Sequence, residues 1–202
     1  MLRQMDQLER QQSREAHIFF LIDMDHFKAV NDHYGHAGGD TVLQQVHARV
    51  AKVFGAEALM VRWGGEEFLV MVADTARSNA PALAAQLNAV FSDTPFVLDG
   101  GVQITQTCSI GLAYFPLDPD APAARSWQQS IAIADFGLYQ AKKSGRNTWR
   151  GLAIAAAKSC MSATVLAGDL PKDRAHRAIC NGCSLLAEHH LMCDSAPSFN
   201  TF

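Results

Sequence analysis

The feature that most constrains the fold is a short apolar run, residues 17–25, with the sequence HIFFLIDMD. Its Ile, Phe and Leu content is typical of a central strand that is covered on both faces of a sheet. The run ends in two carboxylates, Asp23 and Asp25. We therefore expect a buried strand whose polar end reaches a surface.

The other elements follow from periodicity, glycine breaks and capping residues. Helices are expected over 27–34, over 80–91, over 127–143 and after a break and N-cap at Gly38-Gly39-Asp40. Strands are expected over 59–63, 67–73, 102–115 and 148–154, with the last at a sheet edge and a hairpin closed by 64–66. This order predicts an α+β fold, an α/β-like sandwich in which helices flank a central sheet.

The chain divides into three parts. Residues 1–16 are expected to be an N-terminal helix or the truncated start of the domain, and residues 17–154 to be the domain itself. Composition then becomes rich in Ala, followed by Pro, Cys and His, so we expect 155–202 to be a poorly ordered tail. The tail contains Cys180-x-x-Cys183 near histidines, a weak zinc pattern because it lacks a second well-spaced pair.

Composition excludes several classes of function. The 202 residues are 49% hydrophobic, enough for one core. With 17 basic and 20 acidic residues, the net charge of -3 offers no broad cationic surface for a nucleic-acid polymer or an anionic membrane. There is no membrane-spanning run and no signal peptide, and the cysteine count is odd at five, so we expect a cytoplasmic protein.

Carboxylates at two separate places predict a cation site. If the first strand pairs beside the hairpin, Asp23 and Glu66 lie close together, where two ionised carboxylates repel unless a cation intervenes. Mg²⁺ takes one or two carboxylates and completes its shell with waters and substrate phosphates. A phosphate-bearing substrate is therefore expected; the alternative is that these acids are solvated strand ends.

Two further places suit an anion. The amides of Phe27 and Lys28 lie at an expected helix N-terminus, where free N–H groups and the helix dipole favour a phosphate. Lys142 and Arg146 lie around the end of a later helix. The alternatives are a surface lysine in the first case and helix capping in the second.

Several ordered motifs together resemble the bacterial GGDEF family over about residues 17–150. They are Asp23-Met24-Asp25-His26-Phe27-Lys28, Asn31-Asp32, Gly39-Asp40, Arg62-Trp63-Gly64-Gly65-Glu66-Glu67-Phe68, Ser109-Ile110-Gly111, Lys142 and Gly145-Arg146-Asn147. The resemblance implies a mainly antiparallel sheet similar to that of the nucleotidyl cyclases and the polymerase palm. It implies a diguanylate cyclase that condenses two GTP into cyclic di-GMP and two pyrophosphates in bacterial second-messenger signalling.

The resemblance also implies a role for each site residue. Asp23, the Met24 carbonyl and Glu66 would hold Mg²⁺, for which Mn²⁺ can substitute. The nucleotide contacts would be Asn31 and Asp40 to guanine, Phe27 and Lys28 amides to the inner phosphates, and Lys142 and Arg146 to the terminal phosphates. Lys28 would also stabilise charge at the α-phosphate, and Glu67 is a candidate for deprotonating the attacking 3′-hydroxyl. Each domain holds one GTP, so catalysis would need a homodimer.

Two departures from the family matter. Its Arg-x-x-Asp product-inhibition site is replaced by Gly55 and Ala58, so we expect no strong product inhibition there. Its usual opening motif, Asp-x-Leu-Thr-Gly-Leu-x-Asn-Arg, is absent, which favours the alternative of a silent module that binds GTP or cyclic di-GMP as a receptor or dimerisation element. A cyclase making a monomeric cyclic nucleotide is disfavoured by Asn31 and Asp40.

Overall fold

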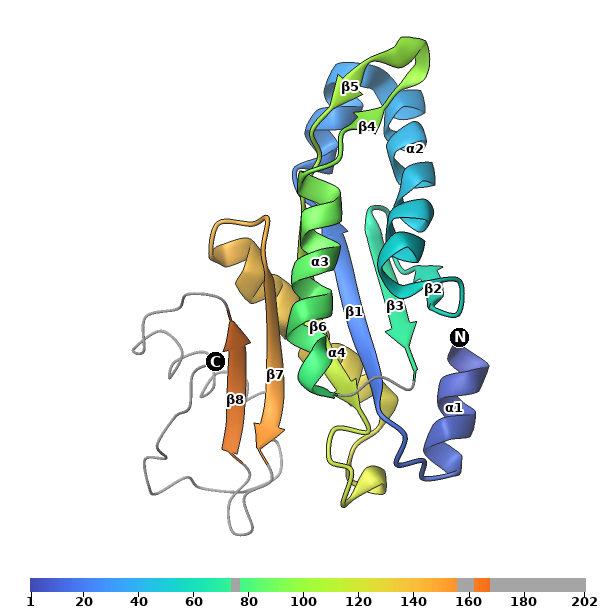
Figure 1. Cartoon of the computed structure of the whole chain (residues 1–202), viewed down its shortest axis with the longest axis vertical. Coiled ribbons are helices and arrows are strands. Elements are labelled where there is room, and N and C mark those ends of the chain that lie inside the picture. Colours follow the sequence, from blue (N-terminus) through green and yellow to red (C-terminus); the bar gives the residue numbers. More distant parts are fainter. Residues whose placement is uncertain (74–76, 156–161, 168–202) are drawn as a thin grey trace.

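The structure, a computed structural model, describes residues 1–73, 77–155 and 162–167 (Figure 1). Its helices and strands are α1 (Leu2–Arg10), β1 (His17–Met24), α2 (Phe27–Phe54), β2 (Leu59–Arg62), β3 (Glu67–Val72), α3 (Ala80–Ser92), β4 (Phe96–Val97), β5 (Gln103–Ile104), β6 (Cys108–Phe115), α4 (Trp127–Lys143), β7 (Trp149–Ala155) and β8 (Ser162–Ala167). Most of the expected tail, including the Cys180-x-x-Cys183 pattern, lies outside the described residues.

Six strands form one sheet in the order β2-β3-β1-β6-β7-β8. All neighbouring pairs are antiparallel except β6 and β7, so the expectation of a mainly antiparallel sheet flanked by helices is confirmed. All eight residues of β1 are buried, as expected for a central strand. The expected edge position of residues 148–154 is wrong, because β8 pairs with β7 and takes the edge.

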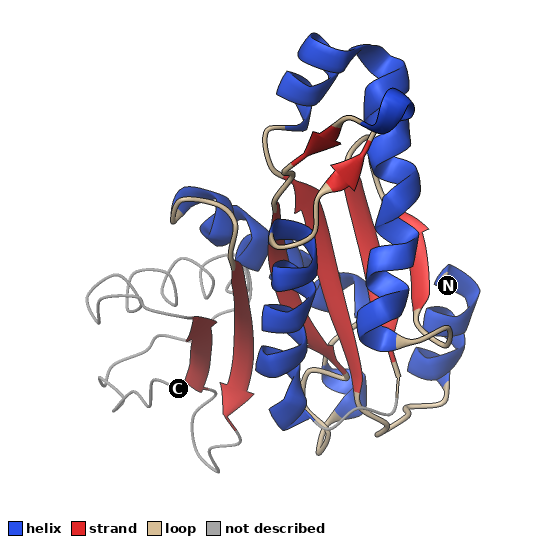
Figure 2. Ribbon diagram, turned by 45° about the horizontal axis from the view of Figure 1, so that its top comes forward, coloured by secondary structure: helices blue, strands red, loops and turns tan. Residues whose placement is uncertain are grey.

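Helices cover both faces of the sheet (Figure 2). The β1 side chains Ile18, Phe20 and Ile22 belong to the core cluster shared with α2 and α3, whereas Phe19 and Leu21 belong to the cluster shared with α1 and α4. Successive side chains of a strand point to opposite faces. After Phe19 and Leu21, the next side chain of β1 that points to the face covered by α4 is the carboxylate of Asp23.

The expected break in the helix after β1 lies at a different residue. The helix continues through Gly38 and Gly39, and the kink in α2 is at Gly35, where φ is 72°. Asp40 therefore lies within a helical segment and is not an N-cap. Gly39 serves close packing instead, since a Cβ there would overlap the side-chain oxygen of Asn31.

Helix α4 lies directly on the sheet and is anchored at its start. Ser126 and Gln129 form a reciprocal capping box, with hydrogen bonds of 2.9 and 3.2 Å. Trp127 then donates its indole N–H to Asp6 of α1 at 2.9 Å. The far end of α4 consequently has a defined place at the polar end of β1. No helix in the part of the chain that the structure describes is long and apolar enough to cross a membrane.

Candidate active site

The hairpin between β2 and β3 places two glutamates beside the end of β1. Asp23 faces Glu67 across the antiparallel ladder, which confirms that the first strand pairs beside the hairpin. The Met24 amide donates to the Glu66 carbonyl at 3.3 Å, and the Trp63 amide donates to the Glu67 carbonyl at 2.8 Å. These main-chain bonds hold Asp23, Glu66 and Glu67 at one end of the sheet.

A basic group from α4 completes this cluster. Lys142 lies in the last turn of α4, and its Nζ is 2.6 Å from Asp23 Oδ2. The Asp23 side chain is only 8% exposed and that of Lys142 is 32% exposed, so this pair is largely shielded from water. A shielded pair is screened less by salt than a surface pair.

Burial perturbs both carboxylates that face each other across the ladder. It raises the pKa of Asp23, although the hydrogen bond and charge of Lys142 and the charge of Arg146 act in the opposite direction. Burial likewise raises the pKa of Glu67, with a further contribution from the charge of Asp23. Perturbed carboxylates that share one end of a sheet are typical of functional sites.

The donor set suits a hard divalent cation. Asp23 and Glu66 offer carboxylate oxygens. Met24, which follows Asp23 and bonds through its amide to the Glu66 carbonyl, offers a main-chain carbonyl. Among residues 1–73, 77–155 and 162–167, no three His, Cys, Asp or Glu side chains gather into a complete metal cage. Two carboxylates and a main-chain carbonyl suit a hard divalent cation that completes its shell with waters and substrate phosphates.

The residues expected to contact guanine lie on the two sides of the kink in α2. The Asn31 side chain packs against Gly39, directly before the exposed residue Asp40. The structure therefore brings Asn31 and Asp40 to neighbouring places, although they are nine positions apart in the sequence.

The two residues expected to contact the inner phosphates begin α2. Phe27 is the first residue of the helix and its side chain is buried, which fixes the helix start against the core. Lys28 instead points outward, and its Nζ pairs with Asp32 at 2.7 Å. Both of those side chains are more than half exposed, so the structure does not bring the Lys28 ammonium group to Asp23.

Asp25 has surroundings that its sequence position did not reveal. Its carboxylate is buried and accepts hydrogen bonds from the Thr107 hydroxyl, the Ser109 hydroxyl and the Asn147 main-chain amide, at 2.8, 2.7 and 2.9 Å. Both of its oxygens therefore accept hydrogen bonds from the protein, whereas Asp23 pairs with Lys142 through Oδ2. Its partners are distant in sequence; Ser109 and Asn147 belong to the motifs Ser109-Ile110-Gly111 and Gly145-Arg146-Asn147, but nothing in the sequence joined them to Asp25.

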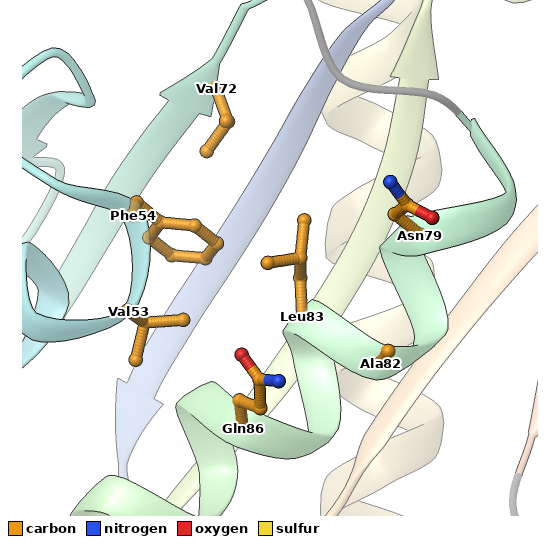
Figure 3. Close-up of a pocket in the computed structure, with 7 residues that line it drawn as sticks. All are labelled: Val53, Phe54, Val72, Asn79, Ala82, Leu83 and Gln86. Atoms are coloured by element: carbon orange, nitrogen blue, oxygen red, sulfur yellow. The ribbon is translucent and has the colours of Figure 1, made fainter.

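A separate hollow of about 310 Å³ lies between α2 and α3 (Figure 3). It is lined by Val53, Phe54, Val72, Asn79, Ala82, Leu83 and Gln86. Val72 pairs with Ile18, at the opposite end of the β1–β3 ladder from Asp23 and Glu67. This hollow is therefore distinct from the carboxylate cluster.

Comparison with known proteins assigns this arrangement to a family. The family model described as "Diguanylate cyclase, GGDEF domain" matches residues 1–148. The chain belongs to the GGDEF family. Response regulator PleD from Caulobacter vibrioides is 41% identical over 134 residues, which are 66% of this chain and 28% of PleD.

Solved GGDEF domains share the fold. The GGDEF domain of TpbB (YfiN) from Pseudomonas aeruginosa aligns with a TM-score of 0.60 and 33% identity, over 72% of this chain and 80% of that one. A structure described as the active GGEEF domain of a diguanylate cyclase from Vibrio cholerae aligns with a TM-score of 0.58 and 27% identity, over 70% and 85% of the two chains. The palm-like fold expected from the motifs is thereby confirmed.

The curated relatives are longer proteins. The chain spans between 16% and 35% of the length of relatives such as an uncharacterized signaling protein from Caulobacter vibrioides and diguanylate cyclase A from Treponema denticola. Family membership supports a role of the diguanylate cyclase kind for this GGDEF domain.

Proposed function

We propose that this GGDEF domain condenses two GTP into cyclic di-GMP and two pyrophosphates, in the cytoplasm, as part of bacterial second-messenger signalling. The observation that carries the proposal is the cluster at the end of β1, where Asp23 faces Glu67 and pairs with Lys142 at 2.6 Å. The cluster combines acceptors for a cation with a cation for a phosphate. The GGEEF signature present here is also named in the description of the active domain from Vibrio cholerae.

Each part of the nucleotide has a proposed partner. Asn31 and Asp40 bind the guanine edge, which their adjoining places in α2 support. The Phe27 and Lys28 amides at the start of α2 receive the inner phosphates. Lys142 and Arg146 contact the terminal phosphates, and Lys28 reaches the α-phosphate by leaving its surface pair with Asp32.

Asp23, the Met24 carbonyl and Glu66 are the proposed ligands of Mg²⁺ or Mn²⁺. When bound, such an ion neutralises phosphate charge and stabilises the leaving pyrophosphate. Lys142 pairs with Asp23 in the free protein, so its ammonium group becomes available to the phosphates once Asp23 has another cation to bind.

The chemical step forms one bond and breaks another at the α-phosphorus. The 3′-hydroxyl oxygen of one nucleotide attacks, and the bond to the bridging oxygen of pyrophosphate breaks. Glu67 is the proposed acceptor of the hydroxyl proton, because it faces Asp23 at the end of β1 and burial raises its pKa. Lys28 stabilises the negative charge that develops on the α-phosphate oxygens.

A homodimer is part of the proposal. One domain holds one GTP, so two domains must face each other for each 3′-hydroxyl to attack the other nucleotide. Specific activity should therefore rise with protein concentration until the dimer is saturated. A specific activity that is constant from nanomolar to micromolar protein argues against this part.

The direct test is incubation of the purified protein with GTP and Mg²⁺, or Mn²⁺, followed by chromatography of the products. Cyclic di-GMP is expected from the native protein and not from Glu66→Ala. Glu57→Ala is the matched control, because Glu57 is an exposed carboxylate before the same hairpin. GTP binding without product, at dimerising concentrations, would instead identify a silent receptor or dimerisation module.

A further inference from the structure

The buried carboxylate of Asp25 connects three segments. Ser109 and Thr107 belong to β6 and the residue before it, whereas Asn147 follows α4. The Asn147 amide donates to Asp25 Oδ2 at 2.9 Å, across 122 positions of sequence. A hydrogen bond to a charged acceptor is stronger than one between neutral groups, so this contact ties the segment after α4 firmly to the end of β1.

The segment that Asp25 holds, residues 145–147, has backbone angles that are unfavourable for residues other than glycine. Gly145, Arg146 and Asn147 have φ values of 114°, 65° and 44°. Two consecutive residues other than glycine in the left-handed region are unfavourable and persist only where surrounding contacts fix them. Here Asp25 holds the main chain of Asn147, and Asn88 donates from its Nδ2 to Asn147 Oδ1 at 3.2 Å.

This turn carries one phosphate ligand of the proposed function and follows the other. Arg146 is its middle residue, and its charge opposes the rise that burial causes in the pKa of Asp23. The Arg146 amide donates to the Ala141 carbonyl at 3.1 Å, which joins the turn to the last turn of α4, where Lys142 lies. Asn147 follows Arg146 directly, so the contacts that hold Asn147 help to fix Arg146, whereas Lys142 is held by α4 itself.

We propose that Asp25 is a positioning residue that, with Asn88, fixes Asn147 and so aims Arg146, beside Lys142, at the terminal phosphates. The role of the turn in phosphate binding rests on the proposed function. The contact by which Asp25 fixes Asn147, the structural half of the inference, does not. Asp25 contacts neither nucleotide nor cation in this scheme and acts only through the turn. Of the two carboxylates at the end of β1, Asp23 thereby binds and Asp25, just after the strand, positions.

The structural half is tested in the nucleotide-free protein. In Asp25→Ala, amide hydrogen exchange at Asn147 is expected to accelerate at least about tenfold, because its acceptor is lost. Ser109→Ala is the matched control: it removes a hydrogen bond from the same carboxylate and should leave exchange at Asn147 near its native rate. Asp25→Asn should restore protection, since an amide oxygen can accept the same N–H. Native exchange in Asp25→Ala overturns the proposal whether or not the protein is a cyclase.

The functional half is tested by calorimetry, comparing GMP with GTP in which a methylene replaces the oxygen between the α- and β-phosphates, so that no pyrophosphate can leave. Asp25→Ala should weaken GTP binding about 10- to 100-fold, the range of a charged hydrogen bond, and GMP binding less than about 2-fold. Asn88→Ala, which alters an exposed contact of the turn, should show the same selectivity with a smaller loss. In an Arg146→Ala background the further effect of Asp25→Ala should largely vanish.

The possible results separate the two proposals. Equal losses of GTP and GMP binding, or full additivity with Arg146→Ala, would overturn the positioning role while leaving the phosphate site intact. If Asp25→Ala does not fold, the selectivity of Asn88→Ala decides the question. Native protein that binds GTP no better than GMP would refute the proposed phosphate ligands, while the exchange experiment would still decide what Asp25 does to the turn.

Discussion

Replacement of Gly111 by alanine should separate α4 from the sheet. A Cβ at this position would lie 2.6 Å from the Leu138 nitrogen and 2.8 Å from the Ala134 carbonyl carbon, and would overlap the Ala134 carbonyl oxygen. All three are main-chain atoms of α4 and cannot rotate away. Since non-bonded contacts are optimal near 3.5–4.0 Å, the helix must retreat by about 1 Å or more.

The cost follows from what α4 buries. Ile131, Ala134 and Leu138 pack in the cluster on this face of the sheet, and a gap of about 0.5–1 Å forfeits a quarter to a half of each contact. Overpacking commonly costs about 1–3 kcal/mol, and main-chain overlap places Gly111→Ala at or above the top of that range. We expect a loss of about 3 kcal/mol or more in the free energy of unfolding, and a midpoint about 6–12 °C lower.

Urea and thermal unfolding followed by circular dichroism measure this loss. Gly65→Ala is the control, because its Cβ meets nothing within 4 Å and Gly65 does not have a positive φ. The control should stay within about 0.5 kcal/mol of the native protein. A Gly111→Ala protein as stable as the control would show that α4 does not depend on this close approach. The retreat should also lengthen the Lys142–Asp23 pair, which a crystal structure of the variant would reveal.

Three other predictions concern charge. Asp23→Asn should raise the free energy of unfolding at neutral pH. Burial raises the pKa of Asp23, so ionising this carboxyl group costs stability as the pH rises above 3.8, its ordinary pKa. Urea denaturation curves should show that the gain disappears below that pH. Arg49→Met should lose about 2–4 kcal/mol in urea unfolding, since the buried guanidinium donates to the Val90, Thr94 and Pro95 carbonyls. Added cyclic di-GMP should not inhibit turnover through Gly55 and Ala58, and strong non-competitive inhibition would contradict this.

Local patterns were sufficient for much of the fold. The apolar run of β1, the hairpin around Gly64-Gly65 and the helix over 127–143 are determined by short-range periodicity and breakers, and they were predicted close to their observed bounds. The pairing of Asp23 with the hairpin was also within reach, since it required only that β1 and β3 be neighbours.

The rest depended on contacts between distant segments. Gly38-Gly39 suggested a helix break, but glycine also serves close packing, and only the position of Asn31 distinguishes the two uses. The pairing of Lys142 with Asp23 and of Asn147 with Asp25 joins residues more than 100 positions apart. No local pattern encodes such pairs, and β8 was missed for the same reason, because its strand character depends on pairing with β7.

The end of β1 carries two carboxylates with opposite effects on the fold. Asp25 is held by three donors and joins β1 to β6 and to the segment after α4, so a descendant without any enzymatic activity would still need it. Burial raises the pKa of Asp23, so we expect the fold to be more stable without the charge of that carboxylate. Relaxed selection should therefore erode Asp23 long before Asp25. A related domain that has lost the counterpart of Asp23 but kept that of Asp25 would be expected to retain the fold without the catalytic activity.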